Sequence, residues 1–285
     1  MSAAALVCSG IRPRVIQTSR GFHPFSHKVT PPPRTTAEDI PDNSSSSSQE
    51  VPKVVVFGGN GFVGQHVCQA ALRLGAEVVS VNRSGAPPEG GKDWVGDVRW
   101  VRGDIFKPED YSAELSDATG VVSCVGAFGS DIFMEKICGD ATVTATEAAE
   151  KAGVERFAFI SAAGCQHDHV LLKGYWKGKQ KAEAAILERF PDDGVILRPG
   201  GIYGDRRVGS VTLPLGFVMG PMEMVLSLPP FSSVRSMSPF EAVLTPPVAV
   251  ENVGTVAAGG VLGLTPSGVL SVDDINRLAK DLDEK

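Results

Sequence analysis

The sequence lacks closely spaced cysteines. Its five cysteines are odd in number and far apart, and no C-x-x-C pair occurs. This pattern argues against a disulfide framework and against a cysteine-based zinc site, and it fits a reducing compartment. The sequence His167-Asp168-His169 has no third and fourth ligand at the usual spacings. We therefore expect no metal site and place these histidines in a solvent-exposed loop.

Concentrated positive charge is also absent. The 285 residues carry a formal net charge of −6, and the lysines and arginines are dispersed along the chain. A nucleic-acid binder needs a concentrated basic surface to neutralise phosphates, so we expect no nucleic-acid partner. The local exception is Lys173–Lys181, where four of nine positions are lysine. We interpret this stretch as a helix face in water.

Acidic residues are missing from Met1 to Ala37, where arginines are spread among serine, threonine and alanine. This composition is typical of a transit peptide, and Arg20-Gly21-Phe22 resembles an arginine-anchored mitochondrial cleavage sequence. We predict import into mitochondria. The alternatives are import into a plastid and a basic tail that is merely disordered. Asp39–Glu50 has too little apolar surface to fold, so we predict that it is a flexible linker.

Short apolar runs alternate with helical patterns from residue 51 onward. The runs have the composition of strands buried on both faces: Lys53–Phe57, Glu77–Val81, Val98–Val101, Gly120–Val125, Arg156–Ser161 and Gly194–Leu197. The helical patterns lie at Gly64–Leu74, Asp131–Ala152 and Trp176–Arg189. Strands and helices in alternation predict an α/β fold with a doubly wound parallel sheet, which is the Rossmann fold.

A glycine-rich turn joins the first predicted strand to the first helix. Gly58 allows a sharp turn, Gly61 lets the backbone approach a pyrophosphate, and Gly64 permits close packing of helix on strand. The helix N-terminus then offers unpaired N–H groups to the anion. The predicted cofactor-binding residues of this turn are Gly58, Gly59, Asn60, Gly61, Phe62, Val63 and Gly64. A purely structural turn is the alternative.

The second predicted strand indicates which dinucleotide is bound. An NAD site places an Asp or Glu on the ribose about twenty residues after the glycine turn. Here Asn82 and Arg83 stand at that place, so no carboxylate repels a 2′-phosphate and Arg83 can pair with one. NADP(H) is therefore favoured over NAD(H), the alternative being that Arg83 is only solvated. After the third strand, Asp104 and Ile105 are placed to contact the adenine, or Asp104 simply caps the next turn.

Three residues have the order of a carbonyl-reducing site. Ser161 ends the fifth predicted strand, and Tyr175 and Lys179 follow at Y-x-x-x-K spacing on the next helix, which places them on one face. Lys179 can approach both the phenol and the nicotinamide ribose and would lower the pKa of Tyr175 toward neutrality. Ser161 would hold the substrate oxygen while Tyr175 donates the proton. The many lysines nearby weaken this signal.

The spacing G-x-x-G-x-x-G resembles that of extended and atypical short-chain dehydrogenases/reductases. Arg198–Gly204 resembles the loop that covers the nicotinamide in extended members. Five segments together resemble one atypical group: Val54–Gly64, Val79–Ser84, Asp104–Pro108, Phe159–Ala162 and Tyr175–Glu183. That group includes a fungal Rossmann protein associated with the mitochondrial coenzyme Q biosynthetic complex and, more distantly, the Rossmann accessory subunit of respiratory complex I. The resemblance covers most of residues 51–204. It implies a NADP(H)-holding protein at the matrix side, with a quinone biosynthesis or respiratory protein complex as partner and peripheral contact with the inner membrane.

Two functions remain open from the sequence. One is a nucleotide-stabilised subunit that supports ubiquinone biosynthesis or respiratory complex assembly. The other is an NADPH-dependent oxidoreductase that acts on a hydrophobic carbonyl or quinone-pathway intermediate through Ser161, Tyr175 and Lys179.

The expected organisation has three parts. Residues 1–50 are the transit peptide and linker, residues 51–204 form the NAD(P)-binding Rossmann domain, and residues 205–285 form a small lobe that completes the pocket. Within the last part, Val211–Leu228 is apolar but is interrupted by Pro214, Pro221 and Glu223. We expect buried packing there rather than a membrane or quinone surface.

Overall fold

The computed structural model describes residues 51–89, 93–167, 171–208, 211–214 and 245–284. All of these described residues belong to one compact unit. The predicted transit peptide and linker lie outside the described residues, as does most of the apolar stretch Val211–Leu228. No helix within the described part combines the length and the apolar character needed to cross a membrane.

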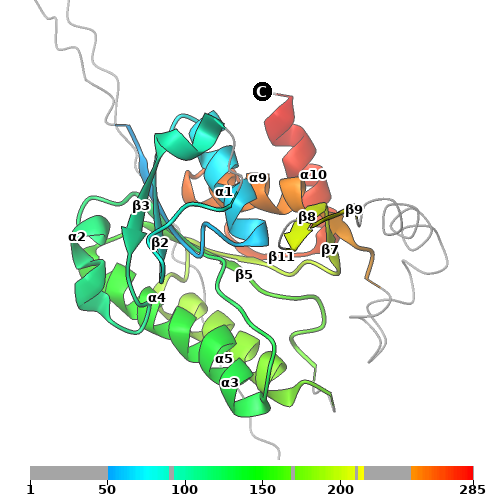
Figure 1. The fold of residues 1–285 in the computed structure, drawn as a ribbon. Helices are drawn as coiled ribbons and strands as arrows, with labels where there is room; N and C mark the ends of the chain where they lie inside the picture. The colour runs from blue at the N-terminus through cyan, green and yellow to red at the C-terminus, as the bar shows by residue number, and fades with distance from the viewer. Residues whose placement is uncertain (1–50, 90–92, 168–170, 209–210, 215–244, 285) are drawn as a thin grey trace, which may run out of the picture. The chain divides into compact units, whose positions relative to one another are not determined.

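A seven-stranded parallel sheet forms the centre of the folded unit (Figure 1). Its strands run in the order β11-β6-β5-β4-β1-β2-β3, which confirms the predicted Rossmann fold. Their bounds are β1 Lys53–Phe57, β2 Glu77–Asn82, β3 Val98–Arg102, β4 Gly120–Ser123, β5 Arg156–Ile160, β6 Gly194–Leu197 and β11 Gly268–Leu270. Every residue of β1, β4 and β6 is buried, as the apolar runs predict.

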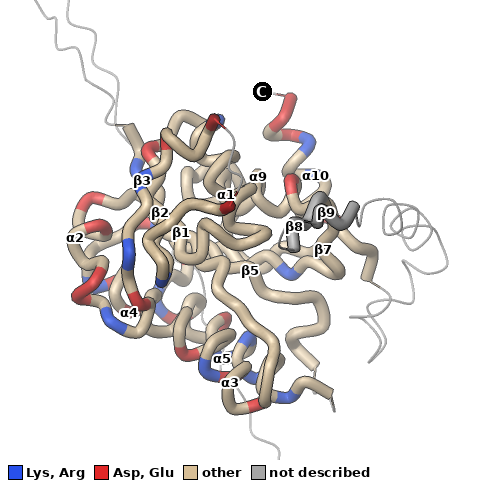
Figure 2. Tube along the Cα trace, in the orientation of Figure 1, with Lys and Arg blue, Asp and Glu red and all other residues tan. Residues whose placement is uncertain are grey.

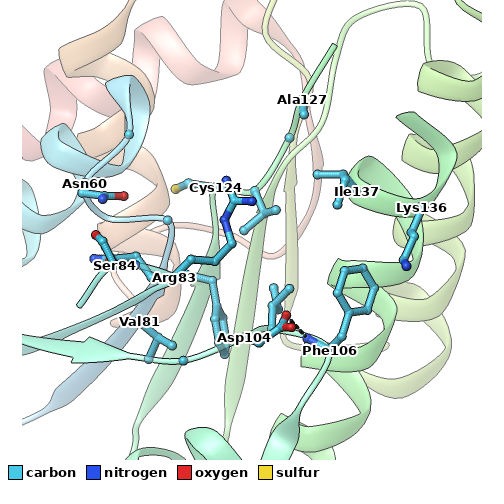
Figure 3. Close-up of a pocket in the computed structure, with 18 of the residues that line it drawn as sticks. Asn60, Val81, Arg83, Ser84, Asp104, Phe106, Cys124, Ala127, Lys136 and Ile137 are labelled. Carbon is cyan, nitrogen blue, oxygen red and sulfur yellow. Dashed lines mark hydrogen bonds between the residues drawn. The ribbon is translucent and has the colours of Figure 1, made fainter. Parts of the chain in front are cut away.

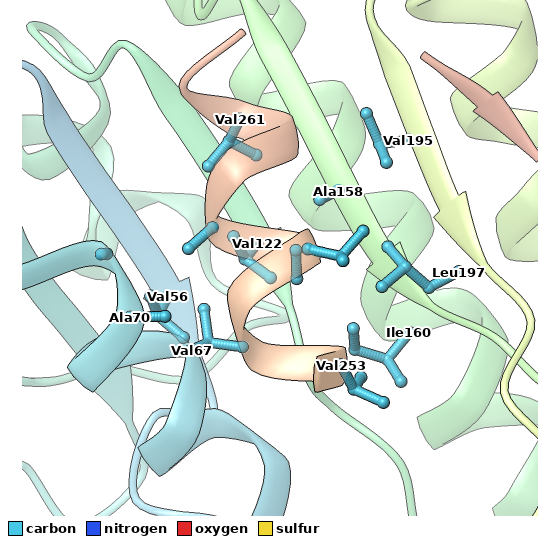
Figure 4. Packing of buried hydrophobic residues seen from close by; sticks show 14 of the residues in the cluster. Val56, Val67, Ala70, Val122, Ala158, Ile160, Val195, Leu197, Val253 and Val261 are labelled. Carbon is cyan, nitrogen blue, oxygen red and sulfur yellow. The ribbon is translucent and has the colours of Figure 1, made fainter. Parts of the chain in front are cut away.

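Helices cover both faces of the sheet because successive strand residues point to opposite sides. Val54 and Val56 belong to the core under α1 Phe62–Arg73, α9 Val250–Val261 and α10 Val272–Asp283. Val55 and Phe57 belong to the core under α2 Ser112–Leu115, α4 Ala141–Ala152 and α5 Lys173–Arg189. Figure 4 shows α9, with Val253 and Val261, lying across the strands of the first core.

Within residues 245–284, β11 joins this sheet and α9 and α10 cover it, an arrangement that the sequence did not predict. Strand β10 Val248–Ala249 pairs with β7 Ile202–Tyr203, α9 packs on α1, and β11 extends the sheet beside β6. Glycines weaken the helical signal of α9, yet a Cβ at Gly254 would lie 2.7 Å from the carbonyl carbon of His66 on α1. Of residues 205–244, the structure describes only β8 Asp205–Val208 and β9 Val211–Pro214, so most of the expected lobe lies outside it.

The helix expected over Asp131–Ala152 is divided into three segments. They are α3 Asp131–Glu135, a π-helical turn η3 Lys136–Asp140, and α4. At this turn Gly139 meets α5, where an added Cβ would lie 2.7 Å from the Cα of Gly178. This close approach of two glycines accompanies a turn that periodicity alone cannot reveal. Helix α5 also begins three residues earlier than expected, at Lys173.

Candidate functional site: a nucleotide cavity at the strand ends

The turn between β1 and α1 has the geometry of a phosphate-binding loop. Gly58 has φ +81°, a region that favours glycine, and its N–H donates to the carbonyl of Val81 at 3.0 Å. A Cβ at Gly64 would lie 2.1 Å from the carbonyl oxygen of Gly58, so α1 packs directly on the turn. Gly61 caps α1 without a side-chain hydrogen bond. The first N–H groups of α1 are therefore left to bind an anion.

A cavity of about 610 Å³ opens beside this turn at the carboxyl ends of β1, β2, β3 and β4 (Figure 3). Dinucleotides bind at this edge of such sheets. The expected cofactor residues that line the cavity are Gly58, Asn60, Gly61, Asn82, Arg83, Asp104 and Ile105. Gly59, Phe62, Val63, Gly64 and Lys179 are not part of its lining.

The loop after β2 carries a cation into the cavity. The amide oxygen of Asn82 accepts hydrogen bonds from the N–H groups of Ser84 and Gly85, at 3.1 and 2.7 Å, and thereby shapes the loop. Arg83 follows Asn82 directly in this loop, and it is exposed. Figure 3 shows its side chain extending into the cavity. It forms no ion pair with any residue that the structure describes.

The loop after β3 forms the adjoining wall. The carboxylate of Asp104 accepts from the N–H of Phe106 at 3.1 Å, and the hydroxyl of Tyr111 donates to the carbonyl of Ile105 at 2.9 Å. Asp104 supplies the only carboxylate among the described residues that line the cavity. This hydrogen bond within the loop agrees with the second role expected for Asp104, which is to cap the turn after β3.

Part of the wall was not predicted. It comprises the residues after β4 and on the helix that follows, together with Phe106: Cys124, Val125, Gly126, Ala127, Phe133, Lys136 and Ile137. The first four follow a buried strand directly, and the rule that ligands bind outside carboxyl ends could have identified them. No sequence signal distinguishes Lys136 from the surrounding helical surface.

Tyr175 and Lys179 lie on one face of α5, as expected. The Lys179 ammonium lies 5.7 Å from the Tyr175 ring centroid and 4.4 Å from that of Phe159, and it donates to the carbonyl of Ile160 at 2.6 Å. Burial lowers the pKa of Lys179. A Cβ at Gly126 would lie 4.0 Å from the ammonium, which places Lys179 just behind the cavity wall.

The expected lowering of the Tyr175 pKa is wrong for this structure. Burial, with smaller contributions from Cys138 and Cys165, raises the pKa of the phenol above its ordinary value. The ring is stacked on Phe128 with centroids 5.4 Å apart. The phenol therefore stays protonated at neutral pH, which suits a proton donor and not a base.

Ser161 does not face Tyr175 with a free hydroxyl. The hydroxyl donates to the carboxylate of Glu183, and Arg198 holds the same carboxylate through two hydrogen bonds of 3.0 and 2.6 Å. Ser161 and Glu183 are both buried. The structure thus brings Tyr175 and Lys179 together and ties Ser161 to an ion pair whose carboxylate is buried and whose guanidinium is partly exposed. No group of histidine, cysteine and carboxylate side chains suited to a metal occurs within the described residues.

Comparisons with known proteins agree with this geometry. Residues 58–219 match the family described as NAD(P)H-binding. An uncharacterized chloroplastic protein of Arabidopsis thaliana is 38% identical over 234 residues, which cover 80% of this chain and 77% of the relative. MIOREX complex component 2 of Saccharomyces cerevisiae is 26% identical over 282 residues, covering 79% of this chain and 99% of that protein.

Solved structures share the fold. The Bordetella bronchiseptica enzyme WbmG, crystallised with NAD, superimposes with a TM-score of 0.54 at 15% identity over 84% of this chain and 79% of its own. At this identity the similarity concerns the fold alone. The family match confirms that the chain is of a nicotinamide dinucleotide-binding type and, with the relatives, confirms the expected likeness to atypical short-chain dehydrogenases/reductases. The chain therefore belongs to the NAD(P)H-binding family of Rossmann-fold proteins.

Proposed function

We propose that the chain is an NADP(H)-binding protein of an organelle, acting as a nucleotide-stabilised subunit that supports ubiquinone biosynthesis or respiratory complex assembly. The observation that carries the choice of cofactor is Arg83, which extends into the cavity from the end of β2. An NAD-specific site would place a carboxylate there, and a guanidinium instead offers charge-assisted hydrogen bonds to a 2′-phosphate.

Replacing Arg83 tests this choice. We expect Arg83→Met to weaken NADPH binding about tenfold, the value of one charge-assisted contact, and to leave NADH binding within about twofold. The control is Arg102→Met, which removes an exposed arginine at the end of β3 that does not line the cavity. Equal losses for both nucleotides in Arg83→Met would contradict a 2′-phosphate contact. Isothermal titration calorimetry measures each affinity.

The role as a subunit rests on a surface as well as on the yeast relative, whose name places it in a complex. Ile132, Leu171 and Phe128 are apolar side chains with exposed fractions of 84%, 79% and 74%. They lie on α3 and on the loops that precede α3 and α5. An exposed apolar surface of this kind suits contact with a protein partner.

We expect Ile132→Ser combined with Leu171→Ser to release the chain from its complex and to leave nucleotide affinity unchanged. Native gel electrophoresis of organelle extracts follows the change, because the wild-type chain should migrate well above its 30.0 kDa mass. A double variant that still migrates with the wild type would contradict docking at this surface.

The organelle is the second element of the proposal. The composition of Met1–Ala37 supports import, and Arg20-Gly21-Phe22 supports mitochondria, on the matrix side. The Arabidopsis relative is described as chloroplastic, which supports a plastid. A fluorescent protein fused after residue 50 separates the two, and diffuse fluorescence in the cytosol would contradict both.

An NADPH-dependent oxidoreductase is the alternative, favoured by the proximity of Lys179 and Tyr175 behind the cavity wall. A bound nicotinamide would supply hydride, and the protonated Tyr175 phenol would donate to the substrate oxygen. Ser161 contributes only if its hydroxyl leaves Glu183. For this function, Tyr175→Phe should abolish reduction of a hydrophobic carbonyl and keep NADPH affinity. Turnover that survives the substitution would remove Tyr175 from the mechanism.

A further inference from the structure

Lys136 is a second cation at the cavity and has no assigned role. It begins the π-helical turn η3 and lines the cavity from the helical side, whereas Arg83 enters from the end of β2. Its ammonium lies 5.1 Å from the ring centroid of Phe106. Figure 3 shows the Lys136 side chain directed toward that ring, across the cavity from the loop that carries Arg83.

Lys136 is not paired with the acidic residues of its own helical segment. The two acidic residues nearest to it along the helix, Glu135 and Asp140, pair with Lys177 and Lys181 of α5 at 2.9 and 2.5 Å. Figure 2 shows acidic and basic segments interspersed where α3 and α5 lie. Lys136 forms no ion pair with any residue in the described part of the chain. Its positive charge is therefore available to a ligand in the cavity.

The surrounding contacts fix the position of this lysine. In the same turn, the thiol of Cys138 donates to the carbonyl of Ala127 at 3.3 Å, which ties the turn to the loop after β4. One residue later, Gly139 packs against Gly178 of α5. A π-helical turn is rare and often occurs at functional sites. Here it holds Lys136 and Ile137 at the cavity wall.

The order of the strands indicates which part of a dinucleotide Lys136 meets. The turn after β1 receives the pyrophosphate, and the end of β2 receives the ribose of the adenosine. Strand β3 lies beside β2, on the side away from β1, so Phe106 and the ammonium above it belong to the adenosine end of the cavity.

We propose that Lys136 recognises, together with Arg83, the 2′-phosphate of the adenosine ribose. This inference rests on the proposed preference for NADP(H). Two cations on different elements would then surround one dianionic phosphate. A ligand without the 2′-phosphate would have no charged group close to Lys136, so the lysine would attract it only weakly.

Fragments of the cofactor test the proposal in the full-length chain. Adenosine 2′,5′-bisphosphate carries the 2′-phosphate, and adenosine 5′-monophosphate lacks it. We expect Lys136→Met to weaken binding of the bisphosphate about fivefold, the upper value for an exposed ion pair, and to change binding of the monophosphate less than twofold. Lys136→Arg should restore the bisphosphate affinity. Lys173→Met, at an exposed lysine outside the cavity lining, should change neither.

The outcomes separate this inference from the proposed function. Lys136→Met losses that are equal for the two fragments, or absent for both, would overturn the role of Lys136. If Arg83→Met still removes the preference for the bisphosphate, the NADP(H) proposal stands without Lys136. A wild-type chain that binds both fragments equally would instead contradict the NADP(H) proposal, and with it the inference. Titration at two salt concentrations adds a further readout, because a phosphate contact through Lys136 weakens with ionic strength.

Discussion

At the scale of single residues, the hydrogen bond of Ser161 to the Glu183–Arg198 ion pair bears most on the choice between functions; the carboxylate of this pair is buried and the guanidinium is partly exposed. Glu183 is 5% exposed, and its two oxygens are held by the Arg198 guanidinium. An ionised carboxylate at this depth needs such partners, because burial without them is costly. The Ser161 hydroxyl completes this set and is thereby diverted from the position that carbonyl chemistry would require.

Glu183→Gln should therefore destabilise the fold more than Ser161→Ala. The first leaves Arg198 without its counter-charge and is expected to lower the free energy of unfolding by about 3 kcal/mol. The second removes one hydrogen bond and should lower it by about 1 kcal/mol. Urea unfolding followed by circular dichroism measures both. A larger loss for Ser161→Ala would show that the serine has a role beyond this ion pair.

The buried thiols should be unreactive. Cys68 and Cys165 are buried, and burial raises the pKa of Cys165 to about 12 and that of Cys68 still further above its ordinary value. The thiolate, which is the reactive form, is then scarce in the folded chain well above the ordinary thiol pKa of about 8.5. At pH 8 we expect iodoacetamide to label these cysteines many times more slowly in the native protein than in urea. Mass spectrometry of the two peptides reads the rates, and fast native labelling of either would contradict its burial.

At the scale of elements, the position of the nucleotide depends on how closely α1 approaches the turn after β1. Gly64 makes this possible because no side chain separates the helix from the Gly58 carbonyl. The same approach directs the N-terminus of α1 toward the cavity. A change in this packing should thus affect binding and stability together.

Gly64→Ala is expected to lower the free energy of unfolding by about 2 kcal/mol through overpacking and to abolish NADPH binding. The matched control is Gly96→Ala, because a Cβ at Gly96 meets no atom within 4 Å. Thermal unfolding with and without NADPH measures both effects. A Gly64→Ala chain that binds normally would show that the turn can widen without loss of the site.

Helix α10 carries a capping box formed by Ser271 and Asp274, which the S-x-x-D spacing predicts. The hydrogen bond from the Ser271 hydroxyl, followed by the one from the Arg277 guanidinium, holds the pKa of Asp274 below its ordinary value. Because the pKa is lower in the folded chain than in the unfolded chain, the cap stabilises the fold above the unfolded pKa of about 3.9. That contribution is lost as pH falls through the folded pKa.

Asp274→Asn should accordingly cost about 1 kcal/mol at pH 7, and the difference from wild type should shrink as pH falls below about 4. Urea unfolding across this range provides the measurement. A difference that does not change with pH would show that the carboxylate charge has no part in the cap.

At the scale of the whole molecule, the parts that depend on local pattern could be predicted from the sequence and the parts that depend on distant contacts could not. Strand β1 has the predicted bounds because its apolar residues follow one another without interruption, and such a run is visible in the sequence itself. The π-helical turn at Lys136 and the partner of Ser161 depend on contacts with α5, which follows in the chain only after β5. The glycines of α9 weaken its helical pattern in the sequence, although in the fold they allow close packing: Gly254 lies against α1, Gly259 against Leu282 of α10 and Gly260 against Val195 of β6.

The most direct test of the account is a titration of the full-length chain with NADPH and with NADH, read by thermal unfolding. A ligand that binds only the folded state raises the unfolding temperature in proportion to the logarithm of its concentration over its dissociation constant. We predict that NADPH raises this temperature more than NADH at every concentration, because Arg83 lies in the cavity where an NAD site would have a carboxylate. A larger shift with NADH, or no shift with either nucleotide at millimolar concentration, would contradict the account.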